Sequence, residues 1–252
     1  MIKKTQQLHK WLKKRYRTVF ISDIHLWHPR SRWDKLIKFL SSIDFENLII
    51  IWDFIDYPQL KRFWKWWKKE ERTINYINKL AKNWINTTYI QWNHDRKLKC
   101  TKEIQIENMT ICREMYYKSL IWKIYYITHW DCIDRINRNW NNLWLIWIFI
   151  SWILLKIEHL WNKKVYTNSH LSIADKLEQL INKIRMSDEK WTRKVKKLKK
   201  NLNCDGVILW HFHMIKHCQI NWIDYFCTWD WRRNCSAVVE DLKWNLEVVK
   251  YK

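Results

Sequence analysis

The hydrophobic positions of the chain form short β-branched runs that alternate with longer stretches of helical spacing. The first runs, residues 17–24, 48–51 and 87–91, are separated by helical patterns at 32–42 and 58–82. Strands that alternate with helices predict an α/β fold containing a parallel sheet. Later runs are expected as strands at 103–112, 121–128, 205–209, 215–220, 223–227, 236–240 and 246–249.

Residues 135–203 interrupt this alternation with basic sequence of helical pattern. We therefore expect one domain over residues 17–252, with a helical insertion at about 135–203 and a basic N-terminal extension at 1–16. The apolar stretch 143–155 is 13 residues long, whereas a membrane-spanning helix needs about 20. It predicts a buried or interfacial helix. The basic start lacks an apolar core of signal-peptide length, which argues against secretion.

Several of the predicted strands end in residues that bind metals. Strand ends carry carboxylate, amide and imidazole side chains in the order Asp23, His25, Asp53, Asn93, His129, His211 and His213. Open α/β sheets place ligands at the carboxyl ends of their strands, so these side chains are expected to gather at one edge. Taken alone, each Asp or His is more often a structural residue. Their recurrence at five strand ends makes the set informative.

Oxygen and imidazole ligands without thiolate suit manganese, iron, zinc or magnesium. Seven ligands exceed the need of one ion and match two ions that share a carboxylate about 4 Å apart, an arrangement that activates water and stabilises a phosphoryl group. His94, beside the amide of Asn93, is then free to act on the leaving oxygen or on the developing charge. The sequence thus predicts a two-metal site for phosphoryl chemistry.

With these blocks the chain resembles the calcineurin-like metallophosphoesterase family, whose motifs are D-x-H, G-D-x-x-D, G-N-H-D, H-G-D and G-H-x-H. The matching stretches run from Asp23 to His25, Trp52 to Asp56, Trp92 to Asp95, His129 to Asp131 and Trp210 to His213. The resemblance implies a four-layer α/β/β/α sandwich. It also implies Asp53 as the bridging ligand, one metal on Asp23, His25 and His213, and the other on Asn93, His129 and His211. By the same resemblance His94 is the catalytic histidine and Asp95 orients it.

The stretch from Tyr225 to Glu240 carries a closer likeness. Trp229-Asp230-Trp231 is similar to the G-D-W block of the UDP-2,3-diacylglucosamine diphosphatase branch, which acts in lipid A biosynthesis and has a helical insertion over its active site. This resemblance implies hydrolysis of the pyrophosphate of a UDP-linked acylated sugar. Among the four metals above we expect manganese first. The apolar stretch 143–155 beside a basic surface leads us to expect a peripheral contact with an anionic membrane.

The composition departs from that of ordinary proteins in one respect: the chain has 22 tryptophans and a single glycine, Gly206. About 7% glycine is usual, which would be roughly 18 residues here. Tryptophan stands where turns and ligand loops need glycine, at positions 27, 52, 92, 130, 210 and 229. Our hypothesis is that most of the tryptophans in the chain are encoded by UGA triplets that specify glycine, whereas Trp231 is a true tryptophan. The alternative is a protein that is genuinely rich in tryptophan, with a poorly formed metal site.

The net charge of +22 suits anionic partners such as a phosphorylated substrate, a membrane surface or nucleic acid. Seven cysteines without a CxxC pair fit reduced thiols in the cytoplasm. Two alternatives to the lipid-nucleotide pyrophosphatase remain open. One is a nuclease or general phosphodiesterase of the same superfamily, and the other is a non-catalytic basic module that binds membranes or nucleic acid.

Overall fold

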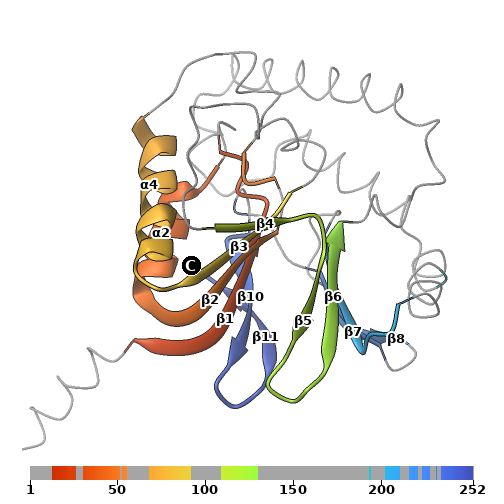
Figure 1. The fold of residues 1–252 in the computed structure, drawn as a ribbon. Helices are drawn as coiled ribbons and strands as arrows, with labels where there is room; N and C mark the ends of the chain where they lie inside the picture. The colour runs from red at the N-terminus through yellow and green to blue at the C-terminus, as the bar shows by residue number, and fades with distance from the viewer. Residues whose placement is uncertain are drawn as a thin grey trace, which may run out of the picture.

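The computed structural model describes residues 13–26, 31–51, 53–55, 68–91, 109–129, 193, 202–210, 216–220, 223–227, 231 and 234–251. These residues form a mixed α/β sandwich of two sheets with helices on one outer face (Figure 1). The α/β fold class predicted from the sequence is thereby confirmed. The insertion expected at about 135–203 lies almost wholly outside the described residues. Within the described part of the chain, no helix is long and apolar enough to cross a membrane.

The six-stranded sheet is mainly parallel. Its order is β11 (Leu246–Lys250), β10 (Ser236–Asp241), β1 (Lys14–Ser22), β2 (Ile43–Ile51), β3 (Asn86–Ile90) and β4 (Met109–Cys112). Strands β1 to β4 are parallel to one another, whereas β10 and β11 add an antiparallel edge. The parallel part therefore has its carboxyl ends, where ligands bind in such sheets, along one edge.

The five-stranded sheet has the order β5 (Met115–Lys118), β6 (Ile124–His129), β7 (Gly206–Trp210), β9 (Ile223–Cys227) and β8 (Lys216–Ile220). Strands β6, β7 and β9 are parallel, and the edge strands β5 and β8 are antiparallel. In Figure 1, β6 runs upward toward the side of the molecule where β1 to β3 end. The strands that precede the predicted ligands thus run toward a common side.

Burial on both faces explains why β2 reads as a continuous apolar run. Leu48 and Ile50 belong to the core beneath the helices, whereas Ile49 and Ile51 belong to the core between the two sheets. Successive side chains of a strand point to opposite faces, so a strand covered on both sides needs apolar residues at every position.

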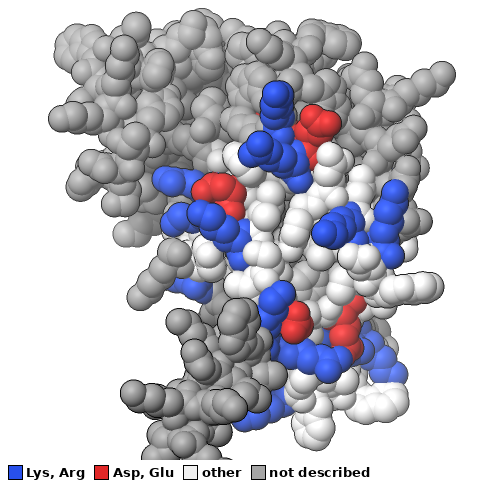
Figure 2. Space-filling model, turned by 90° about the vertical axis from the view of Figure 1, so that its left-hand side faces the viewer, with Lys and Arg blue, Asp and Glu red and all other residues white. Residues whose placement is uncertain are grey.

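Helices α2 (Trp33–Ser42) and α4 (Lys68–Lys82) cover the outer face of the six-stranded sheet (Figure 1). Each buries one apolar stripe in the core beneath it, Leu36, Phe39 and Leu40 from α2, and Ile74 and Ile77 from α4. Their outer faces are polar, and Figure 2 shows Lys and Arg on this side of the molecule, interspersed with fewer Asp and Glu. The spacing expected of amphipathic helices is therefore observed.

Several strand bounds differ from the sequence expectation. Strand β2 begins at Ile43 rather than at 48, and β6 begins at Ile124 rather than at 121, because residues 121–123 belong to the turn after β5.

Strand β1 begins at Lys14, inside the segment expected as a basic extension, because its backbone pairs with β2 from Lys14 and Ile43 onward. Lys14 and Arg15 also form exposed ion pairs with Glu247 and Glu46. Strand β5 (Met115–Lys118) was not predicted, because its four residues are too few to show a period. Of the run expected at 103–112, only 109–112 lie within the described residues.

A buried polar network joins the two sheets. Glu240 of β10 is fully buried, and its carboxylate accepts hydrogen bonds from Arg17 of β1, at 3.0 Å, and from the hydroxyl of Tyr117 on β5. Its second oxygen accepts a bond from the peptide N–H of Leu120, at 2.8 Å. Burial raises the pKa of Tyr117, and its hydrogen bond to Glu240 acts in the same direction. Tyr117 therefore stays protonated and donates to Glu240.

Gly206 stands where no other residue fits. A Cβ atom at this position would lie 2.4 Å from the ring of Tyr125 on β6 and 2.8 Å from the carbonyl oxygen of Asp224 on β9. Both neighbours are its strand partners. The absent side chain lets the tyrosine ring lie across the start of β7.

We expect Gly206→Ala to lower the free energy of unfolding by about 1–3 kcal/mol, because the added methyl group overpacks this contact. Urea unfolding followed by circular dichroism measures the loss. In a Tyr125→Ala background the same substitution should cost less, because most of the clash is with the ring. Equal costs in the two backgrounds would contradict this account.

Candidate metal centre

The parallel register of β1 and β2 brings two ligand-bearing loops together. Ser22, the last residue of β1, pairs with Ile51, the last residue of β2. Asp23 follows directly after β1, and Asp53 lies two residues beyond the end of β2. Neighbouring strands are about 4.8 Å apart, so side chains from these two loops can meet.

The pairing of the two chains continues past the strands. The peptide N–H of His25 donates to the carbonyl of Asp53, at 2.7 Å, and the N–H of Leu26 donates to the carbonyl of Phe54, at 2.9 Å. Leu26 and Ile55 form a parallel β-bridge. The loops after β1 and β2 are therefore fixed to each other by their backbones.

Asp23, His25 and Asp53 share an uncommon backbone conformation. Their φ angles are 54°, 44° and 43°, in the left-handed region that costs an L-residue roughly 1–2 kcal/mol. Asp and His are among the residues that tolerate this region best. Such strain tends to accumulate at functional sites, and here it coincides with three residues that the sequence singled out as ligands.

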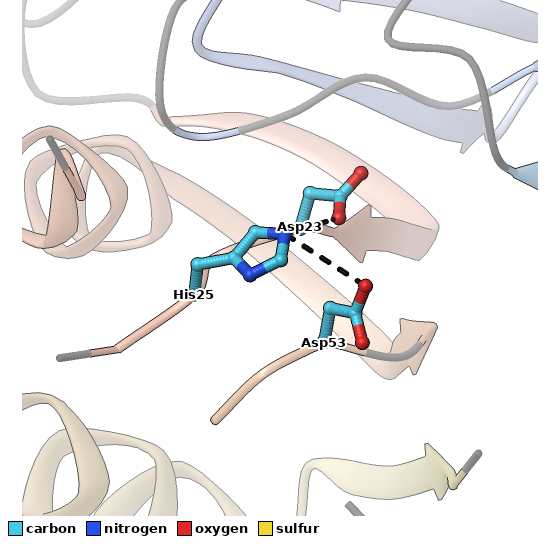
Figure 3. A group of neighbouring side chains, drawn as sticks. All are labelled: Asp23, His25 and Asp53. Carbon is cyan, nitrogen blue, oxygen red and sulfur yellow. Dashed lines mark hydrogen bonds and ion pairs between the residues drawn. The ribbon is translucent and has the colours of Figure 1, made fainter. Parts of the chain in front are cut away.

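The three side chains converge on a small volume (Figure 3). Nε2 of His25 lies 2.9 Å from Oδ1 of Asp23 and 3.7 Å from Oδ2 of Asp53. One ligand atom from each residue falls within 4.8 Å of the others. Asp23 is fully buried and Asp53 is 8% exposed. The structure thus brings together three of the seven predicted metal ligands.

The chemistry of this cluster suits a divalent cation. Two carboxylates held side by side away from water repel each other, and each is costly to bury without a compensating positive charge. Two carboxylates and one imidazole suit manganese, iron, zinc and magnesium. Asp23, His25 and Asp53 therefore fit a metal ion and could bind one.

Trp231 supports this cluster from the core, a role that the sequence did not indicate. Its peptide N–H donates to the carbonyl of Asp23, at 3.1 Å, and its own carbonyl accepts from the N–H of Arg32 before α2, at 2.7 Å. The indole is fully buried and packs against Phe39 with ring centroids 5.4 Å apart. Trp231 thereby links the ligand loop after β1 to helix α2.

The remaining predicted site residues are only partly covered by the structure. His129 is the last residue of β6, and its backbone pairs with Trp210 at the end of β7. His211 follows Trp210 directly in the sequence. The predicted ligands Asn93, His211 and His213 and the predicted catalytic pair His94 and Asp95 lie outside the described residues.

No protein-family model and no curated protein matches this chain. Solved structures do match it. A hypothetical protein from Pyrococcus horikoshii aligns with a TM-score of 0.52 at 7% sequence identity, covering 94% of this chain and 88% of that one. This likeness shows a shared fold.

Two further matches have lower TM-scores. A structure described as a novel archaeal phosphodiesterase aligns with a TM-score of 0.44 at 13% identity, covering 92% of this chain and 98% of that one. A protein from Thermus thermophilus aligns with a TM-score of 0.45 at 11% identity, covering 94% of this chain and all of that one.

We expect manganese to stabilise the folded protein through Asp53. A ligand present at 100 times its Kd stabilises the state that binds it by about 2.7 kcal/mol, which differential scanning fluorimetry detects as a rise in Tm. Asp53→Asn should lose most of this rise while keeping the side-chain volume. The matched control is Asp44→Asn on β2, the strand that precedes Asp53, because Asp44 is exposed and pairs with Lys13. A full manganese response in Asp53→Asn would show that the metal binds elsewhere.

Proposed function

We propose that the protein is a metal-dependent phosphoesterase that cleaves the pyrophosphate of a UDP-linked acylated sugar. The observation that carries the phosphoesterase part is the cluster of Asp23, His25 and Asp53 at the ends of adjacent parallel strands. It joins the first two family-like motifs at the expected edge of the sheet. The substrate rests on the likeness of Trp229-Asp230-Trp231 to the G-D-W block.

Two divalent ions, with manganese as the first choice, fit the proposed ligand sets. Asp23, His25 and His213 would hold one ion, Asn93, His129 and His211 the other, and Asp53 both. The register of the strands supports this division, because Ile51 pairs with Ile90 of β3 as well as with Ser22. When bound, such a pair of ions supplies an activated water and stabilises the charge on the phosphoryl oxygens.

The protein's own residues then have distinct tasks. The fixed backbone of the loops after β1 and β2 holds Asp23, His25 and Asp53 in place before any ligand arrives, so little reorganisation remains. His94 donates a proton to the departing oxygen, and Asp95 holds the imidazole in the orientation for that transfer. Cleavage of the pyrophosphate of UDP-diacylglucosamine in this way releases UMP.

The proposed surroundings of the enzyme follow from its substrate. An acylated, diphosphate-bearing substrate requires an apolar surface beside positive charge, for which the stretch 143–155 and the net charge of +22 are suited. We propose a cytoplasmic enzyme that contacts an anionic membrane peripherally.

A nuclease or general phosphodiesterase of the same chemistry is the second candidate, and the net charge of +22 favours it. On the face shown in Figure 2, however, Lys and Arg are interspersed with Asp and Glu. This pattern is typical of a solvated surface and gives the nuclease no specific support there.

The deciding experiment uses protein with glycine in place of tryptophan at the motif positions 52, 92, 130, 210 and 229, with manganese and UDP-2,3-diacylglucosamine. We expect release of UMP, and a fall of more than about 100-fold when Asp53→Ala is added, because a metal ligand contributes at least as much as its supporting residues. The rate is measured as the amount of UMP resolved by anion-exchange chromatography over time.

Three other outcomes are informative. Cleavage of bis-p-nitrophenyl phosphate without release of UMP, again dependent on Asp53, would retain the phosphoesterase and reject the lipid-nucleotide substrate. Cleavage of DNA with steep salt dependence would favour the nuclease. Loss of all activity together with undisturbed membrane or nucleic-acid binding would favour the non-catalytic module.

A further inference from the structure

Trp84 occupies the position after a helix where glycine is the usual residue. Helix α4 ends at Lys82, and the N–H of Ile85 then donates to the carbonyl of Leu80, at 3.3 Å. This six-residue closure defines a Schellman motif, whose penultimate residue adopts the left-handed conformation. Trp84 is that residue, with φ of 67°.

Trp122 occupies a second such position, in the hairpin between β5 and β6. Its N–H donates to the carbonyl of Ser119, at 3.0 Å, and the N–H of Ser119 donates to the carbonyl of Lys123, at 2.9 Å. These two bonds define a three-residue hairpin loop, in which a type I turn is followed by a residue that must be left-handed. Trp122 has φ of 66°.

Trp244 repeats the same geometry in the hairpin between β10 and β11. Its N–H donates to the carbonyl of Asp241, at 3.3 Å, and the N–H of Asp241 donates to the carbonyl of Asn245, at 3.0 Å. Trp244 has φ of 73°. The Asp241 side chain completes the turn by accepting bonds from the N–H groups of Lys243 and Asn245, so the turn does not depend on the indole.

Large aromatic residues have no physical reason to stand at these positions. The left-handed region lowers the ratio of folded to unfolded protein roughly 5- to 30-fold for an L-residue, and leaves glycine unaffected. The indoles also recover little from burial, since Trp84, Trp122 and Trp244 are 94%, 74% and 59% exposed. The ammonium of Lys118 lies 3.7 Å from the ring centroid of Trp122, which offsets only part of this cost at an exposed site.

Trp231 shows the opposite behaviour. Its side chain is fully buried, with 0% of its surface accessible to water, and its ring packs in the core against Phe39. Glycine there would leave a cavity the size of an indole beside Asp23. The tryptophans whose side chains are described therefore include two classes that differ in both backbone conformation and burial.

We propose that residues 84, 122 and 244 are glycine in the working protein, and that residue 231 is tryptophan. One codon of this gene then specifies glycine in its own cell, and the three turns carry that codon. For residues 84, 122 and 244 the evidence is the backbone geometry of turns that contain none of the predicted metal ligands. It is therefore independent of the proposed enzymatic function and of the family-like motifs, and it extends the glycine hypothesis to positions that no motif indicated.

The first test is peptide mass spectrometry of the protein isolated from its own cells. We expect peptides spanning residues 84, 122 and 244 to be lighter by the mass difference between tryptophan and glycine, and the peptide with residue 231 to carry tryptophan. The gene should have UGA at the first three positions and UGG at the fourth. Tryptophan in the native peptides at the three turns would overturn the proposal.

The second test separates the backbone from the side chain in recombinant protein with the printed sequence. Each of Trp84→Gly, Trp122→Gly and Trp244→Gly should raise Tm by about 2–4 °C. The matched alanine variants remove the same indole but keep a Cβ atom, so they should gain less stability. At each position the ratio of folded to unfolded protein should be roughly fivefold lower for the alanine variant than for the glycine variant. Trp231→Gly should lower Tm. Alanine variants as stable as the glycine variants would show that the backbone conformation is not the cause and would contradict the assignment.

Discussion

The parallel register between β1 and β2 is the constraint on which the site depends. Ser22 pairs with Ile51, and this pairing decides which loop residues leave the sheet together. It also decides which side chains reach each core, because Phe20 and Ile49 lie between the sheets while Ile21 and Ile50 lie beneath the helices. A slip of one residue would exchange these faces. Core packing therefore fixes the relative position of Asp23, His25 and Asp53.

The apolar runs predicted most of the described strands because burial on both faces leaves a direct trace in the sequence. The same reasoning found Asp23, His25 and Asp53, since each ligand follows a strand end. Strand β5 (Met115–Lys118) left no such trace, because its residues alternate between burial and exposure over only four positions.

Other features depend on contacts between segments distant in sequence. The hydrogen bond from the N–H of Trp231 to the carbonyl of Asp23 joins two peptide groups. Such groups occur in nearly every residue, so the residue types do not predict this bond. The left-handed conformations of Trp84, Trp122 and Trp244 were hidden for a different reason. Glycine is the signal by which such turns are normally recognised, and tryptophan carries none of it.

Six of the seven left-handed residues in the described part of the chain illustrate two different physical situations. At Asp23, His25 and Asp53 the strained backbone belongs to side chains that tolerate it and that converge on one small volume. At the three turns the same conformation belongs to side chains that point into water and contribute little. Strain accompanied by convergent chemistry indicates a site, whereas strain without it indicates that the residue does not match its position.

The buried carboxylate of Glu240 gives the sandwich a mechanical property. Because its oxygens accept hydrogen bonds from Tyr117 and from the peptide N–H of Leu120, both in the β5–β6 hairpin of the other sheet, sliding of one sheet over the other would break bonds to a buried carboxylate, at a cost of about 1.5–3 kcal/mol for each bond. These bonds therefore oppose movement of one sheet along the other. The ends of β2 and β6, which carry candidate ligands from different sheets, accordingly keep a set spacing, and the gap that an ion or a phosphoryl group must span is determined by the scaffold before anything binds.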